Sequence, residues 1–285
     1  MADIYFCSFA DSSLLPSLTR IQRQAQEMCV FAQGEIRIFT EKNLPHYAKK
    51  RAGKIIKETG TRKGYGYWSW KPAVIKQMFS KMKDDDILLY CDAGCYLNPN
   101  AKNKLLDYIK KTEENDILVT ELDSEYNSYA WTKMDTIALF RDKVPEKSFE
   151  EGQLQGGTIF LKKSPYTDNI VEQWDRLMDL ENLHYFDDSP SVLPNHPSFK
   201  ENRHDQSILT LLLKSNHYCA EPVKNFTPES EQERERLWRE EPILQLRDRQ
   251  KAKSKTEKLL EFKERIRLGL RRRAKKILVF LGFFS

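Results

Sequence analysis

Two polar motifs in this 285-residue sequence place reactive side chains next to stretches that should be buried. Asp92-Ala93-Gly94 follows the apolar run 87–91, which is too short for most helices and suits a strand buried on both faces. His204-Asp205-Gln206 comes just before the apolar run 208–213. A carboxylate can hold a cation or act as a base, and ligands of open α/β sheets bind at the carboxyl ends of strands. Both motifs are therefore candidates for a ligand site.

Each motif also has a simpler structural interpretation. An Asp-Gly-type turn after a strand would account for residues 92–94. A helix N-cap would account for Asp205, although not for His204 and Gln206 on either side of it. The pattern favours a functional role for the second motif and leaves both interpretations open for the first.

Two glycine-containing segments are further candidates for a ligand site, and the glycine pair of the second would let a ligand approach the backbone. Gly64-Tyr65-Gly66-Tyr67-Trp68-Ser69-Trp70 has aromatic faces that can stack on bases and sugars. Lys71-Pro72 follows it at a predicted helix start, where a lysine and the helix dipole together suit a diphosphate. The second segment, Gly156-Gly157, precedes a predicted strand. Core packing of the tryptophans and a plain tight turn at 156–157 stay open. Trp131, in an aromatic and polar loop, could stack on a sugar or pack inside.

The positions of these motifs follow from an alternation of strands and helices. The pattern predicts strands at 4–9, 36–39, 87–91, 116–120 and 158–162, and helices at 14–30, 47–58, 72–83, 101–114, 170–180 and 205–214. Such alternation predicts an α/β fold with a largely parallel sheet covered on both sides. The sequence has neither Gly-x-Gly-x-x-Gly after its first strand nor a phosphate-loop motif, so a dehydrogenase or kinase lacks its main support.

The composition fits one large domain followed by a basic tail. The five cysteines have no regular spacing, which argues against a disulfide framework and favours a reducing compartment. We expect no signal peptide and no membrane span. The net charge is +5, but residues 231–285 hold 17 Lys+Arg against 9 Asp+Glu, so the body is mildly acidic. We therefore predict a domain at 1–228 and a tail at 229–285.

Four motifs together resemble bacterial sugar-nucleotide glycosyltransferases of the GT-A fold, which build capsule, O-antigen or lipooligosaccharide chains. The motifs are residues 64–72, Asp92-Ala93-Gly94, Gln155-Gly156-Gly157 and His204-Asp205-Gln206-Ser207, and the resemblance covers roughly residues 3–220. It implies a Rossmann-like, mixed, mainly parallel sheet flanked by helices. It also implies transfer of a sugar from a nucleotide-diphosphate sugar, most simply a UDP-sugar, to a glycan or lipid-linked glycan acceptor.

The resemblance also implies roles for individual residues. It implies that the nucleotide sugar is bound by Phe9, Ala10, Lys71, Asp92, Ala93, Gly94, Gly156 and Gly157, and the acceptor by Trp131. In that fold a strand-end Asp-x-Asp motif holds a divalent metal, manganese or magnesium. Here Gly94 stands where the second acid should be. The metal would then be held by Asp92 with His204, or with Asp205. The other alternative is an enzyme that depends only weakly on a metal.

The implied chemistry follows from charge. Cleaving a nucleotide–sugar bond leaves a negative diphosphate and an oxocarbenium-like sugar, so lysines or a divalent cation must stabilise the diphosphate. Asp205 could act as the base of an inverting mechanism. The Asp205-Gln206 pair is also similar to the Asp-Gln-Asp stretch of retaining enzymes that resemble family eight. On this resemblance we favour retention, with Asp205 and Gln206 as the catalytic residues.

The tail predicts contact with a membrane surface. Residues 247–276 carry 14 basic and 4 acidic residues, and the chain then ends in a short apolar run. A basic helix with an apolar end suits an anionic membrane, where each basic residue adds ~1 kcal/mol. We therefore expect a cytoplasmic protein that is peripheral on the inner face of the cytoplasmic membrane. The alternative is a solvated helix that packs on the body or on a second subunit of a homo-oligomer.

Two other classes of function stay open. The basic tail and the aromatic residues would fit a nucleic-acid-binding protein, but the acidic body and the lack of a recognisable RNA motif argue against nucleic acid as a partner. The missing second acid at Gly94 would fit a nucleotide-sugar-binding or scaffold protein without catalytic activity.

Overall fold

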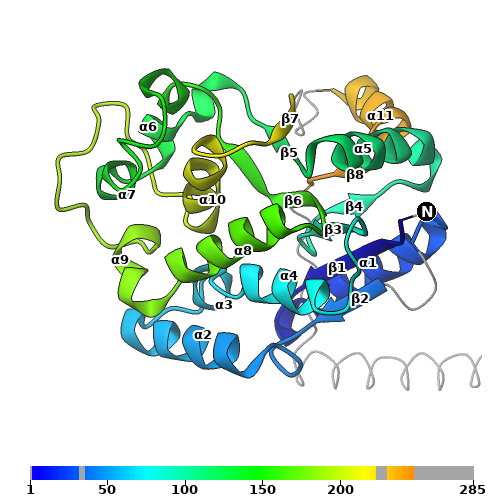
Figure 1. Ribbon diagram of the computed structural model, residues 1–285, viewed down its shortest axis with the longest axis horizontal. Helices are drawn as coiled ribbons and strands as arrows, with labels where there is room; N and C mark the ends of the chain where they lie inside the picture. The colour runs from blue at the N-terminus through cyan, green and yellow to red at the C-terminus, as the bar shows by residue number, and fades with distance from the viewer. Residues whose placement is uncertain (1, 32–35, 223–229, 247–285) are drawn as a thin grey trace, which may run out of the picture.

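The core of the protein is a six-stranded sheet flanked by helices (Figure 1). A computed structural model describes residues 2–31, 36–222 and 230–246. The strand order is β2-β1-β3-β6-β5-β7, and β6 alone is antiparallel to its neighbours. The predicted α/β class, with a mixed, mainly parallel sheet flanked by helices, is confirmed.

The sheet strands are β1 (Ile4–Phe9), β2 (Ile36–Phe39), β3 (Ile87–Cys91), β5 (Ile117–Glu121), β6 (Leu154–Lys162) and β7 (Cys219–Pro222). A small second ladder pairs β4 (Tyr96–Leu97) with β8 (Ile243–Leu244). The longer helices are α1 (Leu15–Met28), α2 (His46–Thr59), α4 (Lys71–Phe79), α5 (Lys102–Asn115), α8 (Pro165–Leu177), α10 (Asp205–Lys214) and α11 (Glu231–Glu240). Short helices are α3 (Gly64–Tyr67), α6 (Ser128–Trp131), α7 (Met134–Ala138) and α9 (Leu183–Phe186).

Strand β3 lies in the middle of the sheet, and this position accounts for its apolar sequence. All five of its residues are buried, because helices cover both faces of the sheet. On one face Leu88 and Tyr90 pack with α2, α4, α8 and α10. On the other face Leu89 packs with α1 and α5. The polar residues that follow β3 are thereby delivered to the sheet edge.

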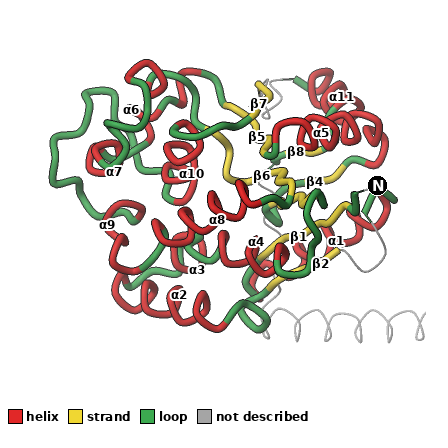
Figure 2. The backbone as a smooth tube through the Cα atoms, viewed as in Figure 1, coloured by secondary structure: helices red, strands yellow, loops and turns green. Residues whose placement is uncertain are grey.

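Two elements begin at least four residues before their predicted starts. Strand β6 begins at Leu154 rather than 158, so Gly156-Gly157 lies inside a strand, and the tight-turn interpretation of this pair was wrong. Helix α8 begins at Pro165 rather than 170, because Ser164 and Thr167 form a capping box in front of the apolar positions. Figure 2 shows the long loop that joins α9 to α10 and reaches the start of α10 from the side.

The described part of the predicted tail returns to the body. Helix α11 lies beside α5 in Figure 1, and β8 pairs with β4. Leu237, Ile243 and Leu244 are buried there. The predicted boundary at 228 and the basic residues 247–285 lie outside the described residues, so the division into two domains stays a prediction. Within the described ranges, no helix has the length and apolar character needed to cross a membrane.

Candidate active site

The predicted motifs meet in one cleft of about 420 Å³. It lies where β3 ends, beside the amino-terminal half of β6 and the starts of α4 and α10. Its lining combines glycines, charged groups and amides: Lys63, Gly64, Trp68, Lys71, Asp92, Gly94, Cys95, Gly156, Gly157, Glu201, Arg203, His204, Asp205, Gln206 and Gln245. Residues more than a hundred positions apart in the chain thus share one cavity.

Lys71 joins the two acidic motifs. Its ammonium lies 2.6 Å from Oδ2 of Asp205 and 3.4 Å from Oδ1 of Asp92, and it donates to the carbonyl of Gly156 at 2.7 Å. The lysine is only 1% exposed. A buried ammonium needs such partners, since an unpaired charge is strongly disfavoured there. The arrangement therefore fixes both carboxylates around a single positive charge.

The protonation states follow from burial and from these neighbours. Burial raises the pKa of Asp205 to about 6, although the Lys71 ammonium acts in the opposite direction. Burial lowers the pKa of Lys71, but the carboxylates of Asp205 and Asp92 more than reverse this, so that its pKa is raised. At neutral pH the site therefore holds an ionised Asp205 beside a protonated Lys71.

Asp92 is the more accessible carboxylate of the pair. Its side chain is 36% exposed, whereas that of Asp205 is 7% exposed. The hydroxyl of Tyr90 donates to Oδ1 of Asp92 at 2.6 Å. This contact follows from strand geometry, because side chains two residues apart point to the same face. Asp92 can therefore meet a ligand while Tyr90 and Lys71 hold its orientation.

The paired glycines keep the floor of the cleft open. A Cβ atom on Gly156 would lie 3.3 Å from Oδ2 of Asp205, and one on Gly157 would lie 3.2 Å from Oδ2 of Asp92. A side chain at either position would crowd a carboxylate. Glycine here lets a ligand contact the backbone of β6 between the two acids.

Gln206 is held in place by its neighbours. Its Nε2 donates to Oε1 of Gln153 at 2.8 Å, and its Oε1 accepts from the backbone N–H of Gly156 at 3.3 Å. Helix α10 begins at Asp205, so the N-cap residue is His204, whose side chain makes no capping hydrogen bond. The N-cap interpretation of Asp205 was therefore wrong, and its carboxylate faces Lys71 instead.

The wall beside Lys71 is a left-handed turn. All five residues from 64 to 68 have positive φ, between 52° and 87°. Gly66 is required on two counts, because its φ is +87° and an added Cβ would lie 2.9 Å from Cα of Ala52. Trp70 is buried and donates its indole N–H to the Gly64 carbonyl, as expected for a core residue. Trp68, in contrast, lines the cleft.

His204 belongs to a hydrogen-bonded cluster at the same wall. Its ring lies against Tyr67 and Trp68, with centroids 5.2 and 5.4 Å away. Its Nε2 is 2.8 Å from Oδ1 of Asp188. That Oδ1 atom also accepts from Lys63, and Oδ2 of the same carboxylate accepts from Tyr67. Burial would raise the pKa of Asp188, but these partners lower it to about 2. His204 has φ +56° and ψ −122°, a strained conformation that the cluster holds.

The side chains present fit a metal ion only in part. Among the described residues, no group of three or more His, Cys, Asp and Glu side chains could hold one. The Nε2 atom of His204 is already engaged with Asp188. Asp92 remains as an accessible oxygen ligand. Magnesium-type cations are often held by one or two carboxylates together with substrate phosphates. The site therefore fits a cation that a bound diphosphate would share with Asp92.

Four predicted residues do not line this cleft: Phe9, Ala10, Ala93 and Trp131. Phe9 is a core residue whose ring centroid lies 3.8 Å from that of Trp70. Ala10 and Ala93 are buried on the other face of the sheet. The ring of Trp131 is covered by the Arg203 guanidinium at 4.1 Å, and its indole N–H donates to Glu125. Their predicted contacts with a ligand stay predictions.

Sequence reasoning missed several residues of the site. Tyr90 could have been found from its spacing of two residues from Asp92. Gln153 and Asp188 carry no such signal, because only the folded chain brings them to α10. The same holds for Gln245, which follows β8. Its Nε2 donates to Oε1 of Gln155 at 2.6 Å and to Oγ1 of Thr158 at 3.1 Å.

Comparison with known proteins gives structural likenesses only. No family model matches the chain, and no curated protein does. A glycosyltransferase involved in the glycosylation of the major capsid of PBCV-1 is 12% identical, covering 85% of this chain and 92% of that chain, with a TM-score of 0.42. Mouse xyloside xylosyltransferase 1 is 9% identical, covering 85% and 97%, with a TM-score of 0.42. The galactosyltransferase LgtC is 8% identical, covering 84% and 85%, with a TM-score of 0.37.

Proposed function

We propose that this protein is a GT-A-type glycosyltransferase that moves a sugar from a nucleotide-diphosphate sugar to a hydroxyl acceptor. One observation carries the proposal: Asp92 and Asp205 face one cleft, with the Lys71 ammonium between them and two glycines beneath. A cleft of this kind suits a ligand that combines an anionic part with a neutral, hydroxyl-rich part. A nucleotide sugar has both parts, joined at the bond that would break.

The donor would bind across the floor of the cleft. The backbone of Gly156 and Gly157 can approach the sugar closely, because no side chain intervenes. Trp68 offers an aromatic face in the wall. Lys63 and Arg203 add positive charge at the rim, although each is already paired with a carboxylate. A UDP-sugar is our first choice of donor, which rests on the sequence resemblance.

The transfer step separates charge, and the site can stabilise both parts. The bond between the anomeric carbon and the β-phosphate oxygen breaks, and its electron pair goes to the phosphate. The acceptor oxygen bonds to the anomeric carbon, and its proton passes to the departing phosphate oxygen. The ionised Asp205 would stabilise the positive sugar, while the Gln206 amide would orient the reacting groups. We favour retention of configuration on the resemblance of this pair to family-eight-like enzymes.

A manganese or magnesium ion is part of the proposal. Asp92 would hold it from the protein side, and the ion would neutralise the diphosphate as it departs. Lys71 keeps the Asp92 carboxylate oriented toward that position.

The biological setting rests on sequence alone. The resemblance suggests a glycan or lipid-linked glycan acceptor in the synthesis of bacterial surface polysaccharides such as capsule or lipopolysaccharide. The basic residues 247–285 suggest attachment to the inner face of the cytoplasmic membrane. Both parts of the setting are proposals that the cleft itself does not require.

The test is a binding screen followed by a turnover assay. Isothermal titration of the full chain with UDP-, GDP- and dTDP-sugars, with manganese and with EDTA, should identify one donor family. Mass spectrometry should then detect free nucleotide and hydrolysed or transferred sugar. Asp92→Asn and Asp205→Asn should each abolish turnover while keeping the far-UV circular dichroism of the wild type.

The possible results separate the alternatives. Near wild-type turnover in either variant would remove that residue from the mechanism. Tight binding of a nucleotide sugar with no hydrolysis and no transfer would instead indicate a binding or scaffold protein. Failure of every nucleotide sugar to bind would refute the proposed function.

A further inference from the structure

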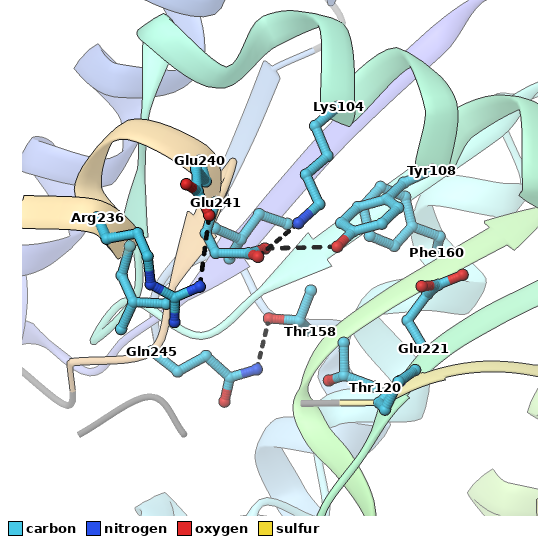
Figure 3. A pocket seen from close by; sticks show the side chains of 13 residues that line it. Lys104, Tyr108, Thr120, Thr158, Phe160, Glu221, Arg236, Glu240, Glu241 and Gln245 are labelled. Atoms are coloured by element: carbon cyan, nitrogen blue, oxygen red, sulfur yellow. Dashed lines mark hydrogen bonds and ion pairs between the residues drawn. The ribbon is translucent and has the colours of Figure 1, made fainter. Parts of the chain in front are cut away.

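A second cavity of about 350 Å³ lies between the sheet, α5 and α11 (Figure 3). It is on the sheet face opposite α4 and α8, and no step of the proposed reaction uses it. Its walls come from β5, β6, β7, α5, α11 and the residues after α11. Most lining side chains are polar: Lys104, Tyr108, Thr120, Thr158, Phe160, Glu221, Pro222, Arg236, Leu237, Glu240, Glu241, Ile243 and Gln245.

The charges of this cavity favour a neutral ligand. Its described lining has three carboxylates, those of Glu221, Glu240 and Glu241, against two cations, Lys104 and Arg236. Lys104 is paired with Glu241, and Arg236 lies 3.5 Å from Glu240. Glu221 is paired with Lys111, which lies outside the described lining, so all three carboxylates have a cationic partner. A phosphate or uronate entering this space would meet only cations that are already paired. A nucleotide is therefore a poor fit.

The same lining has unused hydrogen-bonding capacity. A carboxylate can accept about four hydrogen bonds. Glu241 accepts from Lys104 and Tyr108, as the dashed lines in Figure 3 show. Phe160 and Tyr108 add an apolar surface, because their rings pack edge to face with centroids 5.9 Å apart. A sugar ring needs acceptors for its hydroxyl groups and an apolar surface for its C–H groups. The carboxylates of this cavity can supply the first and the aromatic rings the second.

Gln245 connects this cavity to the cleft. It lines both, and its Nε2 is fixed by Gln155 and Thr158. Its Oε1 lies 3.4 Å from where a Cβ of Gly157 would be, beside Asp92. One side chain thus separates the two spaces at the point where the donor sugar would lie.

We propose that the second cavity is a subsite for a neutral sugar unit of the acceptor, with Gln245 at its boundary with the donor. This inference rests on the proposed function, which it extends by giving one sugar unit of the acceptor a neutral charge and a place in the fold. The helix α11 and strand β8 then serve binding as well as folding, because they supply one wall of the subsite.

The test measures binding of simple sugars directly, without turnover. Saturation-transfer NMR would use the full chain with methyl α-glucopyranoside, methyl β-galactopyranoside and glucuronate as probes. The lining variant is Glu221→Gln/Glu240→Gln. The matched control is Glu235→Gln, which removes the Arg239 ion pair on the same helix but lies outside the described lining. Isothermal titration with UDP checks the donor cleft in each protein.

We expect a neutral glycoside to bind the wild type and the control equally. The lining variant should bind it about tenfold more weakly for each charged hydrogen bond lost, with UDP affinity unchanged. Equal glycoside binding in wild type and lining variant would overturn the inference. So would a preference for glucuronate, or the absence of glycoside binding to the wild type. If UDP fails to bind while the glycoside result holds, the proposed function fails and the sugar site stands.

Discussion

The titration of Asp205 should be visible in catalysis. Its pKa is raised to about 6 by burial, so the carboxylate is ionised at neutral pH and protonated in mild acid. We predict that kcat/KM falls as the pH drops through about 6, because the protonated residue no longer stabilises a positive sugar. The measurement is a pH–rate profile for nucleotide-sugar hydrolysis from pH 5 to pH 8. A flat profile over this range would contradict the role of Asp205.

The raised pKa of Asp205 also affects stability, but in the opposite direction: activity should fall in acid, whereas this contribution to the free energy of unfolding is lost as the pH rises. Because the folded pKa of Asp205 lies above its ordinary value of 3.8, the carboxyl group contributes stability that is fully present below pH 3.8. That stability is lost as the pH rises through about 6. Asp205→Asn should therefore flatten the free energy of unfolding between these two pH values, as measured by urea titration at several pH values.

Lys71 should be needed for folding as well as for activity. Lys71→Met would leave the Asp205 carboxylate buried without its cation, so we expect a loss of about 3–5 kcal/mol of unfolding free energy. Adding Asp205→Asn removes the stranded charge, so the double variant should recover part of this loss. Chemical denaturation of wild type, both single variants and the double variant tests the prediction. Additive losses would show that the two side chains do not interact.

The left-handed turn of residues 64–68 gives a prediction at the scale of an element. Gly66→Ala combines a positive φ with a Cβ only 2.9 Å from Cα of Ala52, and should cost at least ~2 kcal/mol. Gly60→Ala, with φ +67° and open space, should cost about 1 kcal/mol. Gly53→Ala, in helix α2 with nothing within 4 Å, should stabilise by up to about 1 kcal/mol. Thermal unfolding should rank the three in this order; equal effects would contradict it.

The elements that were predictable are those whose pattern is local. Strand β3 and helix α10 follow from continuous apolar runs, and β1 and β2 were predicted with the bounds observed. The antiparallel direction of β6 was not predictable, because it depends on which strands flank it. The start of β6 was predicted too late because glycines are rare inside strands, whereas Gly156 and Gly157 lie inside this one.

The site was predictable for the same reason and to the same extent. Asp92 and Asp205 stand at ends of strongly apolar elements, so local sequence places each at the sheet edge. Their meeting through Lys71 is a tertiary fact. Phe9 shows the limit: the end of a strand was predicted, but the aromatic ring turned into the core. Gln245 shows the other limit, since nothing near it in sequence indicates a site.

At the scale of the whole molecule, the described residues after the predicted boundary pack on the body. A chain that ends at 246 keeps all of these contacts and is the reference for stability. A chain that ends at 229 loses burial of Leu237, Ile243 and Leu244, worth roughly 1.5–3 kcal/mol each. We expect its Tm to fall by roughly 10 °C or more. Differential scanning calorimetry compares the chains, and equal Tm values would mean that α11 and β8 do not stabilise the body.

The chain that ends at 246 is also the proper control for membrane binding. We predict that the full chain floats with vesicles of anionic phospholipid and that the 1–246 chain does not, because the basic residues 247–276 are lost. Raising the salt concentration should release the full chain. Equal flotation of the two chains would place any membrane contact within residues 1–246.

The left-handed turn at 64–68 forms one wall of the cleft, and its conformation depends on the rest of the fold. The left-handed conformation is unfavourable for L-amino acids, so an isolated peptide of residues 64–68 should not adopt this turn. The turn is held in this conformation by the folded body, because Gly66 packs against helix α2. A nascent or half-folded molecule would therefore lack this wall of the cleft, so binding of a ligand to the wall would require the folded body.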